Sequence, residues 1–429
     1  MRHIKAPVKD RQAIRGDLYG VRDQVARIIE EVAQEGDQAV LRGSRRYDLS
    51  QGDTLKVPED VLEESFYALE EDLKTAINTA RDHIARFAEL QMGCIAELEE
   101  TPICPGVLLG HRVVPVDSCG CYIPGGSYPL ISTVLMLAVP AKVAGVKRIC
   151  ACTPVKRGDR LPDRSVLGAL WGAGVTEVYA AGGAHAVAAM AIGTQTIRPV
   201  DLIVGPGNKY VTEAKRQCFG RVGIDFVAGP SEVLVIAERG MGNEEFIAWD
   251  LLAQAEHDLD ARSVLVTTDE ELADRVTSRV ERILQDLPTR DVASRSWEDN
   301  GEVLLAESME EAVEMANRMA PEHLELLAKD PDLWIPKLRN YGSLFIGDHS
   351  AEVFGDYASG TNHTLPTAGA ARYTGGLWVG NFLKVLTNQR ITPMGAERLS
   401  QAAATLAEAE GLWAHRGAAL ARVPQGGRS

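Results

Sequence analysis

Two polar residues stand beside the apolar stripe of one helix, in the segment DLLAQAEHD at 250–258. At 100° per residue, Gln254 and His257 lie along the edge of a stripe that contains Leu251, and residues i and i+3 are about 5–6 Å apart. Such a pair is typical of hydrogen-bonded groups in a core, but it also suits two ligands of one metal ion. The segment alone leaves both interpretations open.

A second pair, Glu322 and His323, stands in the segment MAPEHLEL, where Pro321 fixes the approach to it. An adjacent acid and base can divide the work of catalysis, because one can take a proton from an alcohol while the other activates water. A Glu-His pair is also common on solvated surfaces. The spacing therefore marks a catalytic candidate without excluding the structural alternative.

Two further segments hold side chains of the same types. The loop FGDYASGTNHTLPT contains Asp356 and His363, and its composition is typical either of a binding loop on a rigid scaffold or of a polar surface turn. Near the C-terminus, the segment EAEGLWAHRGAA places Glu410 and His415 around a glycine. A histidine in such a tail can reach only the surface on which the tail packs.

Three glycine turns lie between expected strands and helices: IPGGS at 123–127, AGGAHA at 181–186 and GPGNKYV at 205–211. Backbone N–H groups and the N-terminus of the following helix favour an anion at such turns. None of the three matches G-x-G-x-x-G, the dinucleotide fingerprint, and each by itself suits a plain tight turn. Their number at strand ends favours a phosphate-bearing cofactor.

The elements that position these groups form an α/β pattern. From about Pro115, short apolar strands alternate with glycine turns and amphipathic helices, which indicates a parallel sheet covered by helices. The strand SEVLVIA leads into the helix of Gln254, and RSVLVTT opens another alternating set. Helices of mixed charge are expected over the first hundred residues, and a helical tail after about Ala370.

A chain of 429 residues is too long for one ordinary core. We expect an α/β protein with two Rossmann-like parallel-sheet domains, one inserted in the other, and helical N-terminal and C-terminal segments. The predicted limits are an N-terminal arm at 1–20, a discontinuous first domain at 21–121 and 233–377, an inserted domain at 122–232 and a helical tail at 378–429.

The formal net charge of -15 disfavours binding to nucleic acid or to a lipid surface, so a small-molecule ligand is expected. The charged start MRHIKAPVKDRQ lacks the layout of a signal peptide, and the longest apolar run is interrupted by Pro140 and Lys142, so we expect a cytoplasmic protein. The seven cysteines are too few for a disulfide scaffold. The C-x-C pairs at 119–121 and 150–152 are predicted to be buried, reduced thiols.

Taken together, the motifs resemble the histidinol dehydrogenase family over nearly the whole chain, from about Val25 to Arg422. The segments that carry the resemblance are YIPGGS, STVLML, GPGN, VTEAKRQ, AGPSEVLVIA, DLL.QAEH, PEHL, GDYASGTNH.LPT and E.L.AH. The resemblance implies a domain-swapped homodimer that holds one zinc ion per subunit and uses NAD as electron acceptor. The zinc ligands that it implies are Gln254, His257, Asp356 and, from the tail of the other subunit, His415.

The resemblance also implies a division of catalytic roles. His323 removes the alcohol proton in the first hydride transfer, and Glu322 activates water to attack the retained aldehyde before a second hydride transfer. Substrate contacts are implied for Ser231, Gln254, His257, His323, Asp356, His363, Glu410 and His415. Cofactor contacts are implied for Tyr122, Asn208 and His185, although the family has a glutamine at the position of His185.

The identity of the alcohol stays open in the sequence. GDYASG and the full ligand set resemble the biosynthetic enzymes, which oxidise L-histidinol to L-histidine. LGHRVVPV, NYGSLF and ARYTGGLWVGNFLKVLTNQ are more similar to a sulfopropanediol dehydrogenase branch, which implies 2,3-dihydroxypropane-1-sulfonate and sulfolactate as substrate and product. A non-catalytic ligand-binding protein is a third reading, but such a protein would need neither Glu322 beside His323 nor all four ligands.

Overall fold

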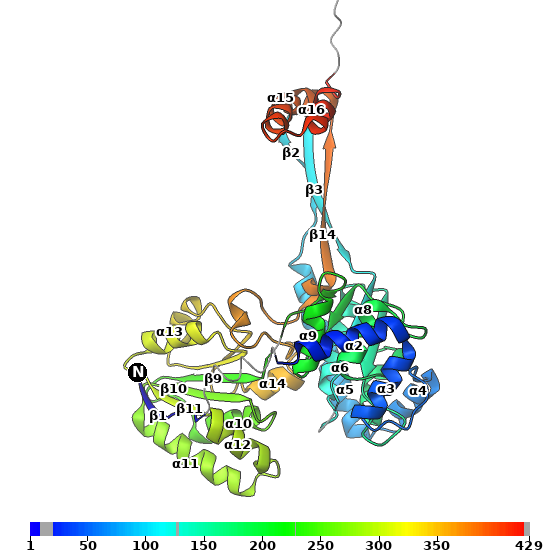
Figure 1. The fold of residues 1–429 in the computed structure, drawn as a ribbon. Helices are drawn as coiled ribbons and strands as arrows, with labels where there is room; N and C mark the ends of the chain where they lie inside the picture. The colour runs from blue at the N-terminus through cyan, green and yellow to red at the C-terminus, as the bar shows by residue number, and fades with distance from the viewer. Residues whose placement is uncertain (9–19, 126–127, 228, 424–429) are drawn as a thin grey trace, which may run out of the picture. The chain divides into compact units, whose positions relative to one another are not determined.

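The computed structural model describes residues 1–8, 20–125, 128–227 and 229–423. The chain divides into two compact units. Unit 1 comprises Met1–Glu89 and Asp117–Phe382, and unit 2 comprises Leu90–Val116 and Leu383–Ser429. Figure 1 shows the elements of both units along the chain.

The first parallel sheet of unit 1 has six strands in the order β1-β11-β10-β9-β12-β13. Only β1 is antiparallel to its neighbour. Its strands are β1 (Arg2–Lys5), β9 (Glu232–Ala237), β10 (Arg262–Thr267), β11 (Glu302–Leu305), β12 (His323–Leu327) and β13 (Ser343–Ile346). Because side chains alternate along a strand, Val233 and Val235 face one core while Leu234 and Ile236 face another.

Helices cover both faces of this sheet, as the near-continuous apolar strands require. The helices are α10 (Glu244–Ala255), α11 (Glu270–Asp286) and α12 (Arg290–Asn300) on one face and α13 (Met309–Met319) on the other. The side chains of Asn243, Asp269 and Ser308 cap α10, α11 and α13 by accepting backbone N–H groups of the first turns. The short helix α14 (Glu352–Tyr357) follows β13.

The second sheet of unit 1 has five parallel strands in the order β6-β5-β4-β7-β8. The strands are β4 (Ser118–Tyr122), β5 (Arg148–Thr153), β6 (Glu177–Ala180), β7 (Leu202–Val204) and β8 (Gly223–Ile224), and the helices between them are α6 (Ile131–Val143), α7 (Arg164–Gly172), α8 (Gly183–Ile192) and α9 (Lys209–Cys218). The chain runs from β4 outward to β6, then returns to β7 on the other side of β4. A crevice between the carboxyl ends of β4 and β7 follows from this reversal.

The N-terminal helices pack with the five-stranded sheet. They are α2 (Arg22–Glu35), α3 (Asp37–Tyr47), α4 (Glu59–Tyr67) and α5 (Glu71–Gly93). Val25 and Val32 of α2 share a core with Met190 of α8, and α2 lies along α8 and α9 (Figure 1). The grouping of 21–121 with 233–377 remains a prediction, but α2 packs against helices of the region 122–232. The physical reason is that α8 is apolar all round and must be covered on the side away from its sheet.

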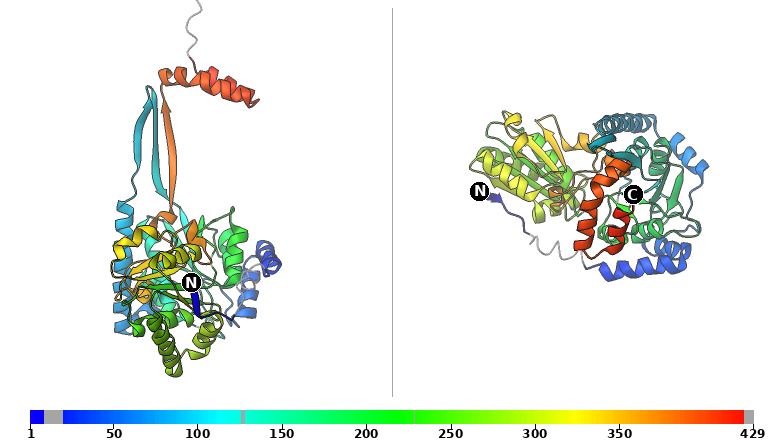
Figure 2. Two further views of the ribbon diagram at one scale, coloured as in Figure 1. Left: turned by 90° about the vertical axis from the view of Figure 1, so that its left-hand side faces the viewer. Right: turned by 90° about the horizontal axis from the view of Figure 1, so that it is seen from above.

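Unit 2 contains a sheet that the sequence did not predict. Strands β2 (Leu98–Cys104), β3 (Val107–Pro115) and β14 (Leu383–Ile391) form it in the order β14-β3-β2, all antiparallel, and run side by side in Figures 1 and 2. The expected helices of the first hundred residues end before it, and the expected helical tail begins only with α15 (Pro393–Ala409) and α16 (Trp413–Leu420). Most of β14 is exposed, so no apolar alternation marked it as a strand.

Four short 3-10 turns complete the described elements: η1 (Pro331–Leu333), η2 (Ile335–Lys337), η3 (Ala370–Arg372) and η4 (Val379–Phe382). All seven cysteines are free, and the four of the C-x-C pairs are buried as predicted. Within the described residues, no helix has the length and apolar character needed to span a membrane. The limits 1–20, 122–232 and 378–429 remain predictions as domain boundaries.

Candidate active site

A cavity of about 840 Å³ in unit 1 is lined by residues of both parallel-sheet regions. On the five-stranded side its wall includes Gly125, after β4, and Gly207, after β7, so it lies at the crevice where the strand order reverses. On the six-stranded side its wall includes Ser231, just before β9, and His323, the first residue of β12. Carboxyl ends of one sheet thus meet amino ends of the other across the cavity.

Glu322 and His323 are both buried in the wall of this cavity. The backbone N–H of Glu232 donates to Glu322 Oε2 at 2.9 Å. Burial raises the pKa of Glu322 to about 8, although the charge of His323 opposes this rise. The carboxyl group therefore titrates close to neutral pH, the range that suits a general base.

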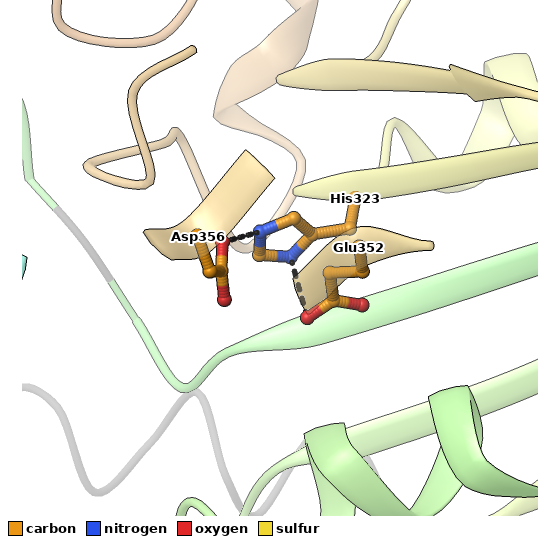
Figure 3. A group of neighbouring side chains, drawn as sticks. All are labelled: His323, Glu352 and Asp356. Carbon is orange, nitrogen blue, oxygen red and sulfur yellow. Dashed lines mark hydrogen bonds and ion pairs between the residues drawn. The ribbon is translucent and has the colours of Figure 1, made fainter. Parts of the chain in front are cut away.

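His323 lies among three carboxyl groups. Its Nε2 lies 3.3 Å from Asp356 Oδ1, and its Nδ1 lies 3.6 Å from Glu352 Oε1 (Figure 3). Burial alone would lower the pKa of His323, but the surrounding carboxylates, Glu352 foremost, outweigh it and raise the pKa well above its usual value. The imidazole is held in a strongly negative environment.

Glu352 is a site residue that sequence reasoning missed. One atom of each of His323, Glu352 and Asp356 lies within 4.8 Å of the others, a grouping of ligand types that can hold a metal ion. Glu352 and Asp356 are four positions apart on α14, which was a usable signal. The burial of Glu352 was not visible in the sequence, because α14 has only six residues.

Gln254 lies in the cavity wall near the end of α10. It is 1% exposed, and neither Oε1 nor Nε2 of its amide has a hydrogen-bond partner among the described residues. Leaving a buried amide unpaired costs about 1–3 kcal/mol, so its position calls for a partner that is not part of the chain. This orphaned amide fits the predicted role as a metal ligand.

Three of the four predicted zinc ligands line the same cavity: Gln254, His257 and Asp356. α10 ends at Ala255, so His257 lies in the turn beyond it and not on the helix, as the sequence analysis assumed. Its backbone N–H donates to Gln254 O at 3.3 Å, which keeps the two residues together. One amide, one imidazole and one carboxylate fit a zinc site that takes further ligands from elsewhere.

The remaining predicted ligand and one predicted substrate contact belong to unit 2. His415 lies on α16 and Glu410 directly follows α15, and both are exposed. Their contribution to a site of a second subunit remains a prediction.

His363 lines the cavity but has both ring nitrogens engaged. Its Nδ1 donates to the backbone oxygen of Asp356 at 2.9 Å, so Nε2 is left to accept from Thr133 Oγ1 at 3.1 Å. Burial lowers the pKa of His363, which favours this neutral form. The structure thus shows His363 linking Asp356 of α14 to α6, and Thr133, which the sequence analysis did not single out, completes the link.

Of the three predicted cofactor residues, one lines the cavity and two do not. Asn208 lines the cavity, and its Oδ1 caps α9 by accepting from Tyr210 N and Val211 N. Tyr122 and His185 are buried and do not line it. The Tyr122 hydroxyl accepts from Gly183 N at 3.0 Å, and burial lowers the pKa of His185 to about 4.

The chain is similar in sequence and in structure to members of one enzyme family. A family model described as histidinol dehydrogenase matches residues 12–423. A histidinol dehydrogenase homolog of Shouchella clausii is 44% identical over 414 residues, 96% of each chain. A sulfopropanediol 3-dehydrogenase of Ruegeria pomeroyi is 40% identical over 411 residues, 95% of this chain and 94% of that protein. The crystal structure of a histidinol dehydrogenase from Elizabethkingia anophelis matches with a TM-score of 0.88 and 36% identity, covering 98% of this chain and 94% of that one.

The orphaned amide of Gln254 predicts that its replacement raises stability without zinc and lowers zinc binding. Gln254→Leu should raise the free energy of unfolding of chelator-treated protein by about 1–3 kcal/mol, because it removes an unpaired buried amide. The same variant should bind less zinc, because it removes a ligand. Thermal unfolding in chelator and zinc content after dialysis measure the two effects.

Gln217→Leu is the matched control for this experiment. The Gln217 amide donates to Arg22 O and to Glu213 Oε1, so its loss should destabilise the protein and leave zinc content unchanged. If Gln254→Leu instead destabilises the chelator-treated protein and keeps full zinc content, the amide is a structural group and not a ligand.

Proposed function

The chain belongs to the histidinol dehydrogenase family of NAD-dependent dehydrogenases, and we propose that it oxidises L-histidinol to L-histidine. The reaction removes four electrons in two hydride transfers, consumes one water and reduces two NAD. The observation that supports it best is one cavity that combines the Glu322 and His323 pair with Gln254, His257 and Asp356. A non-catalytic binding role is set aside, since the chain is a member of an enzyme family.

In this proposal, zinc is held by Gln254, His257 and Asp356 together with His415 of the partner subunit. When bound, it supplies a Lewis acid that holds and orients the alcohol. The orphaned amide of Gln254 supports this assignment. NAD takes the crevice between β4 and β7, where Gly207 and Asn208 of the turn before α9 line the cavity at the start of that helix.

The two buried residues divide the proton transfers. In its neutral form, His323 would accept the proton of the alcohol, and bound NAD would supply the acceptor for the hydride from the alcohol carbon. Glu322 then accepts a proton from the water that attacks the aldehyde, and the hydrate loses the second hydride to give the carboxylate. The raised pKa of Glu322, about 8, suits a base that must take up and release a proton near neutral pH.

The charge of the cavity favours an amine-bearing alcohol. Four carboxyl groups line it: Asp258, Asp260, Glu322 and Asp356. Lys209 is the only lysine or arginine among the lining residues of the described chain. A cationic α-amine can pair with the Asp258 or Asp260 side chain of this wall, whereas a sulfonate carries a permanent negative charge and needs several donors or cations.

The second candidate substrate is 2,3-dihydroxypropane-1-sulfonate. It is supported by the 40% identity to the sulfopropanediol 3-dehydrogenase of Ruegeria pomeroyi and by the segments that resemble that branch. The chemistry at Glu322 and His323 would be the same. Only the pocket wall that recognises the far end of the alcohol would differ.

We also propose a homodimer in which the C-terminal helices of each chain serve the other. In unit 1, α10 and α14 expose Trp249, Phe354 and Tyr357, between 45% and 55% each. In unit 2, Leu406 and Trp413 are 66% and 64% exposed. Large apolar side chains exposed on a surface are typical of regions that a partner covers.

Substrate choice is tested by steady-state kinetics of zinc-loaded protein with NAD. We expect kcat/KM for L-histidinol to exceed that for 2,3-dihydroxypropane-1-sulfonate by on the order of 10²-fold or more, because one ligand opposes the charge of the wall and the other repeats it. The reverse preference would move the chain to the sulfopropanediol branch while leaving the catalytic assignments intact.

The division of labour is tested by supplying alcohol and aldehyde separately. Glu322→Gln should spare oxidation of the alcohol more than oxidation of the aldehyde, which needs attacking water. His323→Asn should impair the alcohol step. Each loss is expected to be on the order of 10²–10⁴-fold in NADH formation. Equal impairment of both steps in both variants would show that the two residues act as one unit.

The donation of His415 across subunits is tested by complementation. Homodimers of His415→Ala and of Glu322→Gln should each be nearly inactive, but co-expression should restore about a quarter of full activity, because half of the dimers are mixed and each has one intact site. Co-expression of Glu322→Gln with His323→Asn is the control and should restore none, since each site of a mixed dimer then carries one of the two defects. Full zinc content and turnover in His415→Ala homodimers would reject the assignment.

A further inference from the structure

A buried ion pair holds the first residue of the turn at 205–208, whose residues Pro206, Gly207 and Asn208 line the cavity. Lys215 comes from α9 and Asp225 directly follows β8, and their side chains are 3% and 0% exposed. The Lys215 ammonium contacts Asp225 Oδ1. Neither residue lines the cavity, and neither has a role in the proposed chemistry.

The pair holds both backbone groups of one residue. Lys215 Nζ donates to the carbonyl oxygen of Gly205 at 2.9 Å, and Asp225 Oδ2 accepts from the N–H of Gly205 at 2.8 Å. Asp225 Oδ1 also accepts from Phe226 N at 2.7 Å, and Phe226 is one of the residues that line the cavity. Lys215 and Asp225 therefore fix the backbone of Gly205, and Asp225 also fixes that of Phe226.

Gly205 packs closely against the carboxyl end of β4, so closely that only glycine fits there. Its φ of +126° lies in the region that favours glycine, and a Cβ at this position would lie 2.2 Å from Tyr122 O. Gly205 therefore contacts Tyr122 at the carboxyl end of β4 on one side. On the other side it is hydrogen-bonded to Lys215 and Asp225. Gly207 and Asn208, which follow at once, line the cavity.

Stability alone does not account for this pair. Removing two charges from water is expensive, and buried ion pairs are often replaced by apolar residues of similar volume without loss of stability. An apolar pair, however, cannot bind the N–H and the carbonyl oxygen of Gly205 at the same time. The ion pair therefore fixes the position of the Gly205 backbone, which apolar packing alone would not do.

We propose that Lys215 and Asp225 are positioning residues that clamp the 205–208 turn in the conformation that binds NAD. The proposal rests on the assignment of this turn to the dinucleotide made above. The clamp acts through Gly205 and touches neither NAD nor the alcohol. Its loss should therefore weaken dinucleotide binding and spare the rate of the bound complex.

The test is the double variant Lys215→Met/Asp225→Leu, which replaces both charges by apolar side chains of similar size. We expect its thermal midpoint to fall, because the buried N–H and carbonyl oxygen of Gly205 lose their partners, while the Kd for NADH and the KM for NAD rise on the order of tenfold and kcat stays within about twofold. NADH fluorescence gives Kd without any alcohol present, so this readout does not depend on which substrate is correct. A double variant with normal Kd and KM for the dinucleotide would overturn the clamp.

The control is Arg148→Met/Glu177→Leu at the opposite end of the same sheet. Arg148 Nη2 and Glu177 Oε1 form an ion pair of 2.6 Å where β5 and β6 begin, and neither residue lines the cavity. This variant should leave the Kd for NADH unchanged. A rise equal to that of the first double variant would mean that any loss of an ion pair loosens the domain, and would also overturn the clamp.

Asp225→Asn covers the case in which the double variant does not fold. It keeps the shape of the side chain and an oxygen for the Gly205 N–H, but it removes the charge that holds the Lys215 ammonium. We expect a rise of several-fold in the Kd for NADH with unchanged kcat. An unchanged Kd would contradict the proposal, and a protein that binds no NADH even without substitution would contradict both the clamp and the proposed function.

Discussion

The parallel pairing of β4 with β5 on one side and β7 on the other is the constraint on which the site depends. It forces the chain to leave the sheet in opposite directions at neighbouring strand ends, so the residues after Tyr122 and after Val204 meet at one crevice. In the six-stranded sheet, the pairing of β9 with β12 brings Ser231 beside Glu322 and His323 in the same way, but at amino ends. One sheet presents turns suited to a cofactor, and the other presents acid and base.

Glu322 and His323 lie in an environment that a stable core would avoid. Behind His323, Glu352 N–H donates to Glu325 Oε1 at 3.1 Å, and Glu325 shares a hydrogen bond with Asp250. Burial raises the pKa of Asp250 to about 6 and that of Glu325 well above its usual value. Carboxyl groups concentrated around one imidazole weaken folding, and such concentrations are typical of sites shaped by their chemistry.

Sequence patterns predicted most of this architecture where the signal was local. The alternation of strands, glycine turns and helices after residue 115 was visible, and so were the chemical types of Gln254, Glu322 and Asp356. Local patterns did not predict contacts between segments that lie far apart in the sequence. The docking of α2 on α8, the pairing of β14 with β3 and the burial of Glu352 all depend on segments far away in the chain. His257 beyond the end of α10 shows the smaller error, a helix boundary placed two residues late.

The long antiparallel pairing in unit 2 has a consequence for synthesis. β3 is the central strand of its sheet, and its partner on one side, Leu383–Ile391, emerges near the end of translation. At ribosomal rates of about 5–20 residues per second, one edge of β3 waits roughly tens of seconds for that partner. An unpaired edge of this length can recruit a strand from another nascent chain. During that interval the unpaired edge of β3 is a site at which nascent chains can aggregate.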